Sequence, residues 1–291
     1  MTLSVVVPVR LAADTITATI QALLIQCQGL EAEIIAVVSG EDPSRAVLRD
    51  LEPKLRVIEM AGRHSVPQLR AEGIRAARGR LVAITEDHCL FSPGWAAGLV
   101  RTLDSRDAAA AGGPVENGRT GSGLEWAIYF SRYAGSMPPL PRGSTGSLPG
   151  NNACYKREVL ETLAPLYAHG FWENDINREL AARGYVLWLE PDLVVTHHKP
   201  YRFGPYLALR YRHARCFGGM IQTGRMQRAL LSPLIPVLLL VRAARAVFAK
   251  KRRRRQFLLA LPPLLLCYLV WFWGELVGYL CGPGQSCSQT D

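Results

Sequence analysis

Two carboxylates and an imidazole, Glu86, Asp87 and His88, directly follow the apolar run 81–84. A continuous apolar run that is partly β-branched is typical of a strand buried on both faces. Open α/β sheets bind ligands at the carboxyl ends of such strands. Oxygen and imidazole donors suit a divalent cation that holds a phosphate-bearing substrate. The segment therefore indicates a metal and phosphate site, and an ordinary polar turn after a strand is the alternative.

The elements that would position these groups alternate in type over the first 115 residues. This βαβαβαβ order predicts an α/β fold with a mostly parallel sheet covered by helices on both faces. Right-handed crossovers then bring the ends of the first, second and fourth strands to one edge. The expected strands are 3–9, 33–38, 55–59 and the run that ends at Glu86, and the expected helices are 15–28, a segment from Pro43 and 67–77.

The middle of the chain is less regular. Residues 135–150 are rich in Gly, Pro and Ser, and a loop of this length is typical of a lid, a binding loop or a disordered segment. A short strand is expected near 153–156, and a helix from Glu173 to about Arg183 that Gly184 ends. Strands near 186–189 and 193–196 are expected to complete the sheet.

The net charge of +10 belongs to one stretch of the 291 residues. Residues 201–255 hold 14 Lys and Arg and no Asp or Glu, whereas residues 1–200 are slightly acidic. Such asymmetry indicates an anionic surface as partner. Lipid headgroups are favoured over nucleic acid, because the residues around the basic stretch are apolar rather than aromatic and polar.

Residues 226–291 have the composition of a membrane-associated segment. The apolar stretch 230–241 is interrupted by Arg242 and Arg245, which leaves it short of the roughly 20 residues that a span requires. Residues 256–281 contain one carboxylate, Glu275, and are long enough to span with tilt. The basic run 250–255 should lie on the cytoplasmic side. We therefore expect an interfacial or re-entrant segment followed by one transmembrane helix, with a two-helix hairpin as the alternative. The expected domains are 1–225 (catalytic), 226–255 (basic, interfacial), 256–281 (transmembrane) and 282–291 (tail).

The seven cysteines form no CxxC pair, so neither a zinc knuckle nor a redox motif is indicated. Their scattered placement predicts reduced thiols in the cytosol. Cys281 and Cys287 are exceptions, because they follow the last apolar segment and could face an oxidising compartment. The N-terminal residues have no charged region and no cleavage site, and they are typical of a first strand rather than a signal peptide.

Four segments, taken in order, carry a resemblance to a known family. The segments are 4–10 (SVVVPVR), 68–79 (QLRAEGIRAARG), 83–88 (AITEDH) with Pro93-Gly94-Trp95, and 170–180 (GFWENDINREL) with Gly184-Tyr185 and Thr196-His197-His198. Together they resemble family 2 glycosyltransferases of the GT-A fold over roughly residues 2–225. The resemblance implies an inverting transfer from a nucleotide-diphosphate sugar to an acceptor hydroxyl. It also implies a metal that offsets charge on the departing diphosphate and a carboxylate base for the acceptor proton.

The resemblance assigns the metal site. Glu86, Asp87 and His88 occupy the position of the family's DxD motif, which is usually all aspartate. Asp87 and His88 are expected to ligate Mn²⁺ or Mg²⁺, and an imidazole ligand favours Mn²⁺. Relatives place a histidine after a later strand, and of the adjacent pair we expect His198, rather than His197, to help bind the metal or the diphosphate.

The resemblance also places Glu173 and Asp175 at the position of the catalytic base. Glu173 is the favoured base and Asp175 the next choice. The alternative is that both are ordinary carboxylates at a helix N-terminus, where the helix dipole favours negative charge.

Further positions are expected to bind the nucleotide sugar, for which a UDP-sugar is favoured. Pro8, Val9 and Arg10 would cradle the nucleobase, mainly through their backbone. Glu41 would replace the aspartate that usually ends the second strand, a departure that affects the uridine preference. Glu86, Asp87 and Arg70 would face the donor, Arg70 at the diphosphate, and Asn152 would bind a sugar hydroxyl.

The sequence thus predicts a membrane-anchored glycosyltransferase at the cytoplasmic face of an inner or plasma membrane, acting on a lipid-linked or membrane-bound hydroxyl. A non-catalytic, membrane-tethered nucleotide-sugar-binding protein is the alternative, motivated by His88 in the metal motif and by the altered turn after the second strand. A nucleotidyltransferase is disfavoured, because residues 10–14 lack the Gly-rich basic loop of that class.

Overall fold

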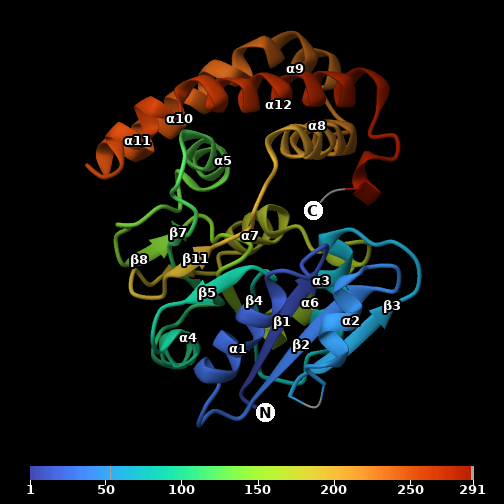
Figure 1. The fold of residues 1–291 in the computed structure, drawn as a ribbon, viewed down its shortest axis with the longest axis vertical. Helices are drawn as coiled ribbons and strands as arrows, with labels where there is room; N and C mark the ends of the chain where they lie inside the picture. Colours follow the sequence, from blue (N-terminus) through green and yellow to red (C-terminus); the bar gives the residue numbers. More distant parts are fainter. Residues whose placement is uncertain (53, 290–291) are drawn as a thin grey trace. The chain divides into compact units, whose positions relative to one another are not determined.

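The computed structural model describes residues 1–52 and 54–289 (Figure 1). The chain forms two compact units that interleave in sequence. The first comprises residues 1–116 and 138–199, and the second comprises 117–137 and 200–291. The expected domain boundary at residue 225 therefore falls inside the second unit.

The first unit is built on an eight-stranded sheet of order β3-β2-β1-β4-β9-β6-β10-β8. The first four strands along the chain pair in parallel, as the βαβ pattern predicts, whereas β9 is antiparallel to both β4 and β6. The fold is thus mixed α/β with a parallel-dominated sheet. Its strands are β1 (Leu3–Val9), β2 (Ala32–Ser39), β3 (Arg56–Met60), β4 (Leu81–Ile84), β6 (Ala110–Gly112), β8 (Gly143–Thr145), β9 (Ala153–Lys156) and β10 (Leu187–Leu189).

Helices cover both faces of this sheet, and alternate residues of each strand serve two separate cores. In β1, Val5 and Val7 face the core of α1 and α4, while Val6 faces the core of α3 and α7. The approach of α3 is close, because a Cβ on Gly73 would lie 2.3 Å from Val6 Cγ1. The helices of this unit are α1 (Ile16–Gln26), α2 (Ser44–Arg49), α3 (Val66–Ala76), α4 (Trp95–Ser105), α6 (Arg157–Thr162), η1 (Ala164–Tyr167) and α7 (Glu173–Ala182).

A second sheet of three short strands lies in the order β5-β11-β7, formed by β5 (Cys89–Phe91), β11 (Val195–His197) and β7 (Val115–Asn117). The strand expected near 193–196 therefore belongs to this small sheet rather than to the main one. Its antiparallel pairing sets His197 opposite Cys89, the residue that follows the Glu86-Asp87-His88 turn. The small sheet thus brings a distant histidine to the end of β4.

The second unit is helical. It consists of α5 (Gly123–Tyr133), α8 (Phe203–Met220), α9 (Arg225–Leu231), η2 (Ser232–Leu234), α10 (Ile235–Ala249), α11 (Arg254–Leu259), α12 (Leu261–Cys281) and η3 (Ser286–Gln289). Glycines allow α12 to pack closely on α8: a Cβ on Gly274 would lie 2.5 Å from Tyr211 O, and one on Gly278 would lie 2.5 Å from Arg215 O. The helical stretches 225–249 and 261–281 are each long and apolar enough to cross a membrane by length and composition.

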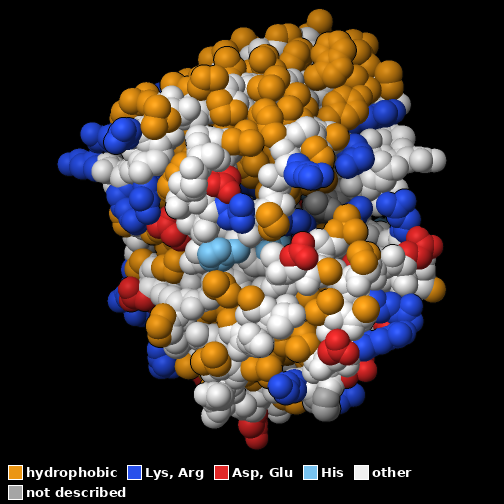
Figure 2. Space-filling view, in the orientation of Figure 1, with side chains coloured by type: hydrophobic (Ala, Val, Ile, Leu, Met, Phe, Trp, Pro, Cys, Tyr) orange, Lys and Arg blue, Asp and Glu red, His pale blue; other side chains and the backbone are white. Residues whose placement is uncertain are grey.

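Large apolar side chains are exposed on these helices, and Figure 2 shows them gathered over α9, α10 and α12. They include Met226, Leu230, Leu234, Val237, Leu238, Leu265, Leu269 and Trp273. An exposed apolar surface of this extent is typical of a site that another apolar surface covers.

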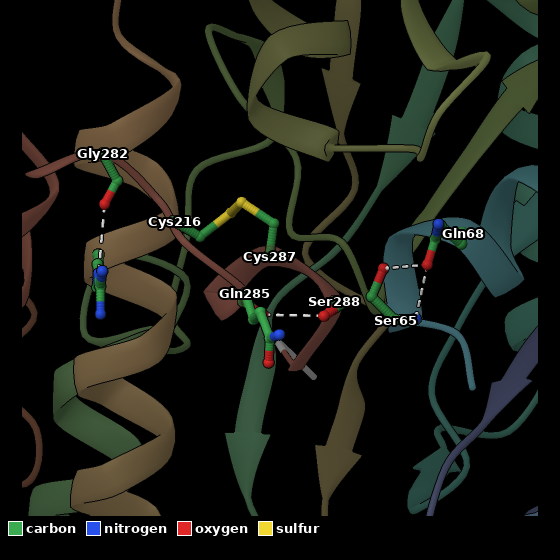
Figure 3. Close-up of a disulfide and its surroundings, with 8 residues drawn as sticks. Ser65, Gln68, Cys216, Gly282, Gln285, Cys287 and Ser288 are labelled. Atoms are coloured by element: carbon green, nitrogen blue, oxygen red, sulfur yellow. Dashed lines mark hydrogen bonds between the residues drawn. A yellow bond between two sulfur atoms is a disulfide. The ribbon is translucent and has the colours of Figure 1, made fainter.

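A disulfide joins Cys216 of α8 to Cys287 of η3 (Figure 3). The expectation of reduced thiols is therefore wrong for Cys216, whose partner is 71 residues away in sequence and could not be recognised from spacing. The pairing requires the end of α8 and the segment after α12 to lie on the same side of any membrane.

Candidate active site

The site in the first unit centres on a buried arginine that holds two carboxylates from different elements. Arg70 of α3 donates through Nη2 to Glu86 Oε1 and through Nη1 to Glu173 Oε2, both at 2.9 Å. Glu86 follows β4, and Glu173 is the first residue of α7. The three side chains, 103 residues apart at the extremes, therefore form one constellation.

Arg70 is 5% exposed, so its removal should destabilise the first unit. Arg70→Met would leave two facing carboxylates without their counter-charge. We expect a loss of about 3 kcal/mol in the free energy of unfolding, measured by denaturant titration of the purified protein. Arg75→Met on the same helix is the matched control: its exposed pair with Glu72 should contribute under about 0.5 kcal/mol. Equal losses for the two variants would contradict the assignment.

A compact set of potential metal ligands lies beside Arg70. One ligand atom each from Glu86, His88 and Cys89 lies within 4.8 Å of the others, and all three residues are buried. Glu86 Oε2 and His88 Nε2 are 3.1 Å apart. Burial raises the pKa of the Cys89 thiol, which favours its protonated form, so the carboxylate and the imidazole are the stronger donors. A carboxylate oxygen with an imidazole nitrogen fits a divalent cation such as Mn²⁺.

His197, and not His198, reaches this set. The His197 ring centroid lies 4.4 Å from that of His88, and its Nε2 lies 4.0 Å from Glu86 Oε2. His198 instead donates its backbone N–H to the carbonyl of His88. Successive residues of a strand point to opposite faces, so only one of the two imidazoles can face the site. The expected choice of His198 is not supported by this geometry.

Asp87 orients its neighbours. Its Oδ2 accepts the backbone N–H of Arg10 at 2.7 Å, and its Oδ1 contacts Nδ1 of His88 at 2.5 Å. A carboxylate on one imidazole nitrogen fixes the ring and leaves the other nitrogen for a ligand. In the structure Asp87 therefore holds the His88 ring through Nδ1, whereas the sequence predicts that Asp87 binds the metal directly.

The two candidate bases occupy different surroundings. Glu173 is bound to Arg70 inside the site. Asp175 pairs with Arg178 at 2.6 Å on the outer surface of α7, where the arginine side chain is 76% exposed. The geometry therefore favours Glu173, and it gives Asp175 the ordinary role of a carboxylate in the first turn of a helix.

Glycine at position 150 makes room for the Glu173 carboxylate. A Cβ at Gly150 would lie 2.6 Å from Glu173 Cδ and 2.9 Å from its Oε2. We expect Gly150→Ala to push the carboxylate away from Arg70 and to lower kcat by about 10²-fold, because small displacements of catalytic groups are that costly. Gly146→Ala in the same loop, where a Cβ would meet nothing within 4 Å, should leave steady-state kinetics unchanged. Similar kcat values for the two variants would rule this effect out.

Asn152, the residue expected to bind a sugar hydroxyl, lies in the interior of the first unit. It is fully buried, its Oδ1 accepts Trp95 Nε1–H, and its Nδ2 donates to the carbonyls of Pro114 and Leu193. Its amide is thus committed to joining three segments of the fold. The expected sugar contact is not supported by this geometry, since the amide is buried and both of its N–H groups are used within the fold.

At the end of β2, Asp42 rather than the expected Glu41 contacts the loop that follows β1. Glu41 is exposed, whereas Asp42 accepts the N–H of Leu11 at 2.8 Å and that of Ser44 at 2.9 Å. Asp42 thereby fixes the loop after β1. Pro8 and Val9 end β1 in the buried sheet, close to the Glu86 turn, since Val6 pairs with Ile84. The segments expected to hold the nucleobase therefore meet at one edge of the sheet. The sequence Asp-Pro-Ser is typical of a helix start, and this pattern could have indicated that the Asp42 side chain binds backbone N–H groups.

A parallel-dominated α/β sheet with acidic and imidazole groups at the end of β4 is the arrangement of a protein that binds a ligand at the carboxyl edge of its sheet. The chain matches the family model "Glycosyl transferase family 2" over residues 4–164, more than half of its length. It belongs to this family and is a glycosyltransferase.

Solved structures share the fold. A mannosyltransferase from Pyrobaculum calidifontis, in complex with GDP-Man and Mn²⁺, is 21% identical with a TM-score of 0.54, and the match covers 98% of this chain and 86% of that one. S. aureus TarS 1–349 is 12% identical with a TM-score of 0.51, covering 99% and 89%. The same protein in complex with UDP-GlcNAc gives a TM-score of 0.50. No curated protein matches the chain in sequence.

Proposed function

We propose that the protein is an inverting, metal-dependent glycosyltransferase that moves a sugar from a nucleotide-diphosphate donor to a hydroxyl of a lipid-linked or membrane-bound acceptor. The observation that carries the proposal is the bridge of Arg70 between Glu86 and Glu173. It joins the metal-ligand set to a carboxylate suited to act as base. The similar structures bound to GDP-Man with Mn²⁺ and to UDP-GlcNAc support a nucleotide-sugar donor, and we retain a UDP-sugar as the first choice.

Each side chain then has a separate task. Glu173 takes the proton from the acceptor hydroxyl as that oxygen attacks the anomeric carbon. Arg70 fixes the Glu173 carboxylate, and Asp87 fixes the ring of His88. Glu86 and His88, with His197 nearby, would hold a divalent cation. Such a cation supplies charge that stabilises the departing nucleoside diphosphate.

The second unit supports attachment to one face of a membrane. Helices α5 and α8 pack against α12. Ile128, Tyr206 and Cys267 share a core, and Arg215 Nε donates to the carbonyl of Gly282. If α12 crossed the bilayer, the arginines of α8 would have to enter it beside α12, at a high cost. We therefore replace the expected single span with helices that lie in the plane of the interface, their apolar side in lipid.

Reporter fusions at each terminus test this arrangement. Helices in the interfacial plane place the C-terminus on the same side as the N-terminus. A C-terminal reporter active only on the opposite side would restore the single transmembrane span.

A donor screen tests the enzymatic proposal. Nucleotide release from UDP-, GDP- and dTDP-sugars would be followed on the full-length protein in detergent, with lipid acceptors and with Mn²⁺, Mg²⁺ or EDTA. Release from one donor that EDTA abolishes is the expected result. Donor binding without release under any condition would favour the non-catalytic alternative.

A further inference from the structure

A cavity of about 370 Å³ lies within the second unit, apart from the residues of the proposed chemistry. Its walls come from the segment before α5, from α5 itself and from the beginning and end of α11. The lining residues include Thr120, Ser122, Trp126, Arg253, Arg255 and Leu259. The volume falls within the range of roughly 300–1,000 Å³ that is usual for small-ligand sites.

The cavity carries uncompensated positive charge. Arg253 lies over the Trp126 ring, with Cζ 5.1 Å from the ring centroid. The nearby carboxylate of Glu125 is already used, since it binds Arg119 and accepts the backbone N–H groups of Gly121 and Ser122. Over the described part of the chain, no ion pair joins Arg253 or Arg255 to a carboxylate. Two guanidinium groups therefore face the cavity without an anionic partner.

Guanidinium groups bind phosphate through paired N–H donors, and the N-terminus of α5 adds a favourable field for an anion. One wall is apolar and continues to the surface: Leu259 lines the cavity and is 64% exposed, and its neighbour Leu258 is 54% exposed. A ligand with a phosphate group beside a hydrocarbon chain matches both features. We propose that this cavity binds the phosphate group of an anionic lipid, as a site separate from the proposed donor site.

Thermal unfolding of the full-length protein in neutral detergent tests the proposal. Phosphatidylglycerol should raise the unfolding midpoint by about 5 °C, and phosphatidylcholine should not raise it. The double variant Arg253→Ala/Arg255→Ala should lose this shift. The matched control is Arg242→Ala/Arg245→Ala, which removes two exposed charges from α10 and should keep the shift. Thr120→Trp should also lose the shift, because it fills the cavity from an exposed position without altering charge.

The outcomes separate the possible sources of binding. A similar shift with inorganic phosphate alone would support the phosphate site but make free phosphate a sufficient ligand. Equal loss of the lipid shift in both double variants would overturn the proposal, because diffuse attraction to the basic stretch would then explain it. No shift in the unaltered protein with either probe would overturn it as well.

Discussion

Glu173→Gln should lower kcat by about 10³-fold while leaving the fold and donor binding intact. The substitution keeps the size of the side chain and a hydrogen-bond acceptor for Arg70 Nη1, but it removes the group that can take a proton. General-base catalysis by a positioned carboxylate typically contributes 10²–10⁴-fold. The loss should therefore appear in kcat rather than in KM for the donor, measured as sugar transfer under saturating donor.

Asp175→Asn is the matched control, two residues further along α7. Its carboxylate pairs with the exposed Arg178, an arrangement that contributes little, so transfer should stay within about twofold of the unaltered rate. If Asp175→Asn abolished transfer and Glu173→Gln did not, the assignment of the base from the Arg70 contact would be wrong.

The two carboxylates Glu173 and Asp175 show which parts of the site can be predicted from the sequence. The motif around 170–180 brings both to one helix start, and the choice between them depends on a partner 103 residues earlier. Arg70 could be placed near a phosphate from its motif, yet no spacing rule says that it reaches both Glu86 and Glu173. The alternation of strands and helices was predictable from hydrophobic periodicity, which is a local rule. The edge of the sheet at which the site lies was predictable because the handedness of crossovers is general.

Other features could not be predicted, because they depend on long-range packing. Asn152 follows a loop rich in Gly, Pro and Ser. Only the fold shows that its amide is hydrogen-bonded to Trp95 and to two backbone carbonyls. The segment 117–137 lies in the middle of the sequence but folds with the C-terminal helices, so a boundary drawn along the chain must miss it. The disulfide of Cys216 likewise joins residues that no spacing pattern links.

His88→Ala should weaken Mn²⁺ binding by at least about tenfold, with a parallel loss of metal-stimulated transfer. Its Nε2 lies 3.1 Å from Glu86 Oε2, and its Nδ1 is held by Asp87, so the ring is oriented to share a cation with Glu86. Partners that merely orient a metal ligand are worth 10–100-fold in affinity, and a direct ligand should be worth no less. Mn²⁺ titration followed by the free-ion electron paramagnetic resonance signal, with and without nucleoside diphosphate, measures this independently of turnover.

The adjacent residues His197 and His198 allow a further comparison in the same Mn²⁺ titration. His197 lies beside His88 with its Nε2 4.0 Å from Glu86, while His198 contacts the site only through its backbone N–H. His197→Ala should therefore reduce Mn²⁺ affinity, and His198→Ala should not. The opposite ranking would mean that metal binding rotates the end of β11 and selects the other imidazole. Loss in neither variant would confine the metal site to Glu86, His88 and the diphosphate of the donor.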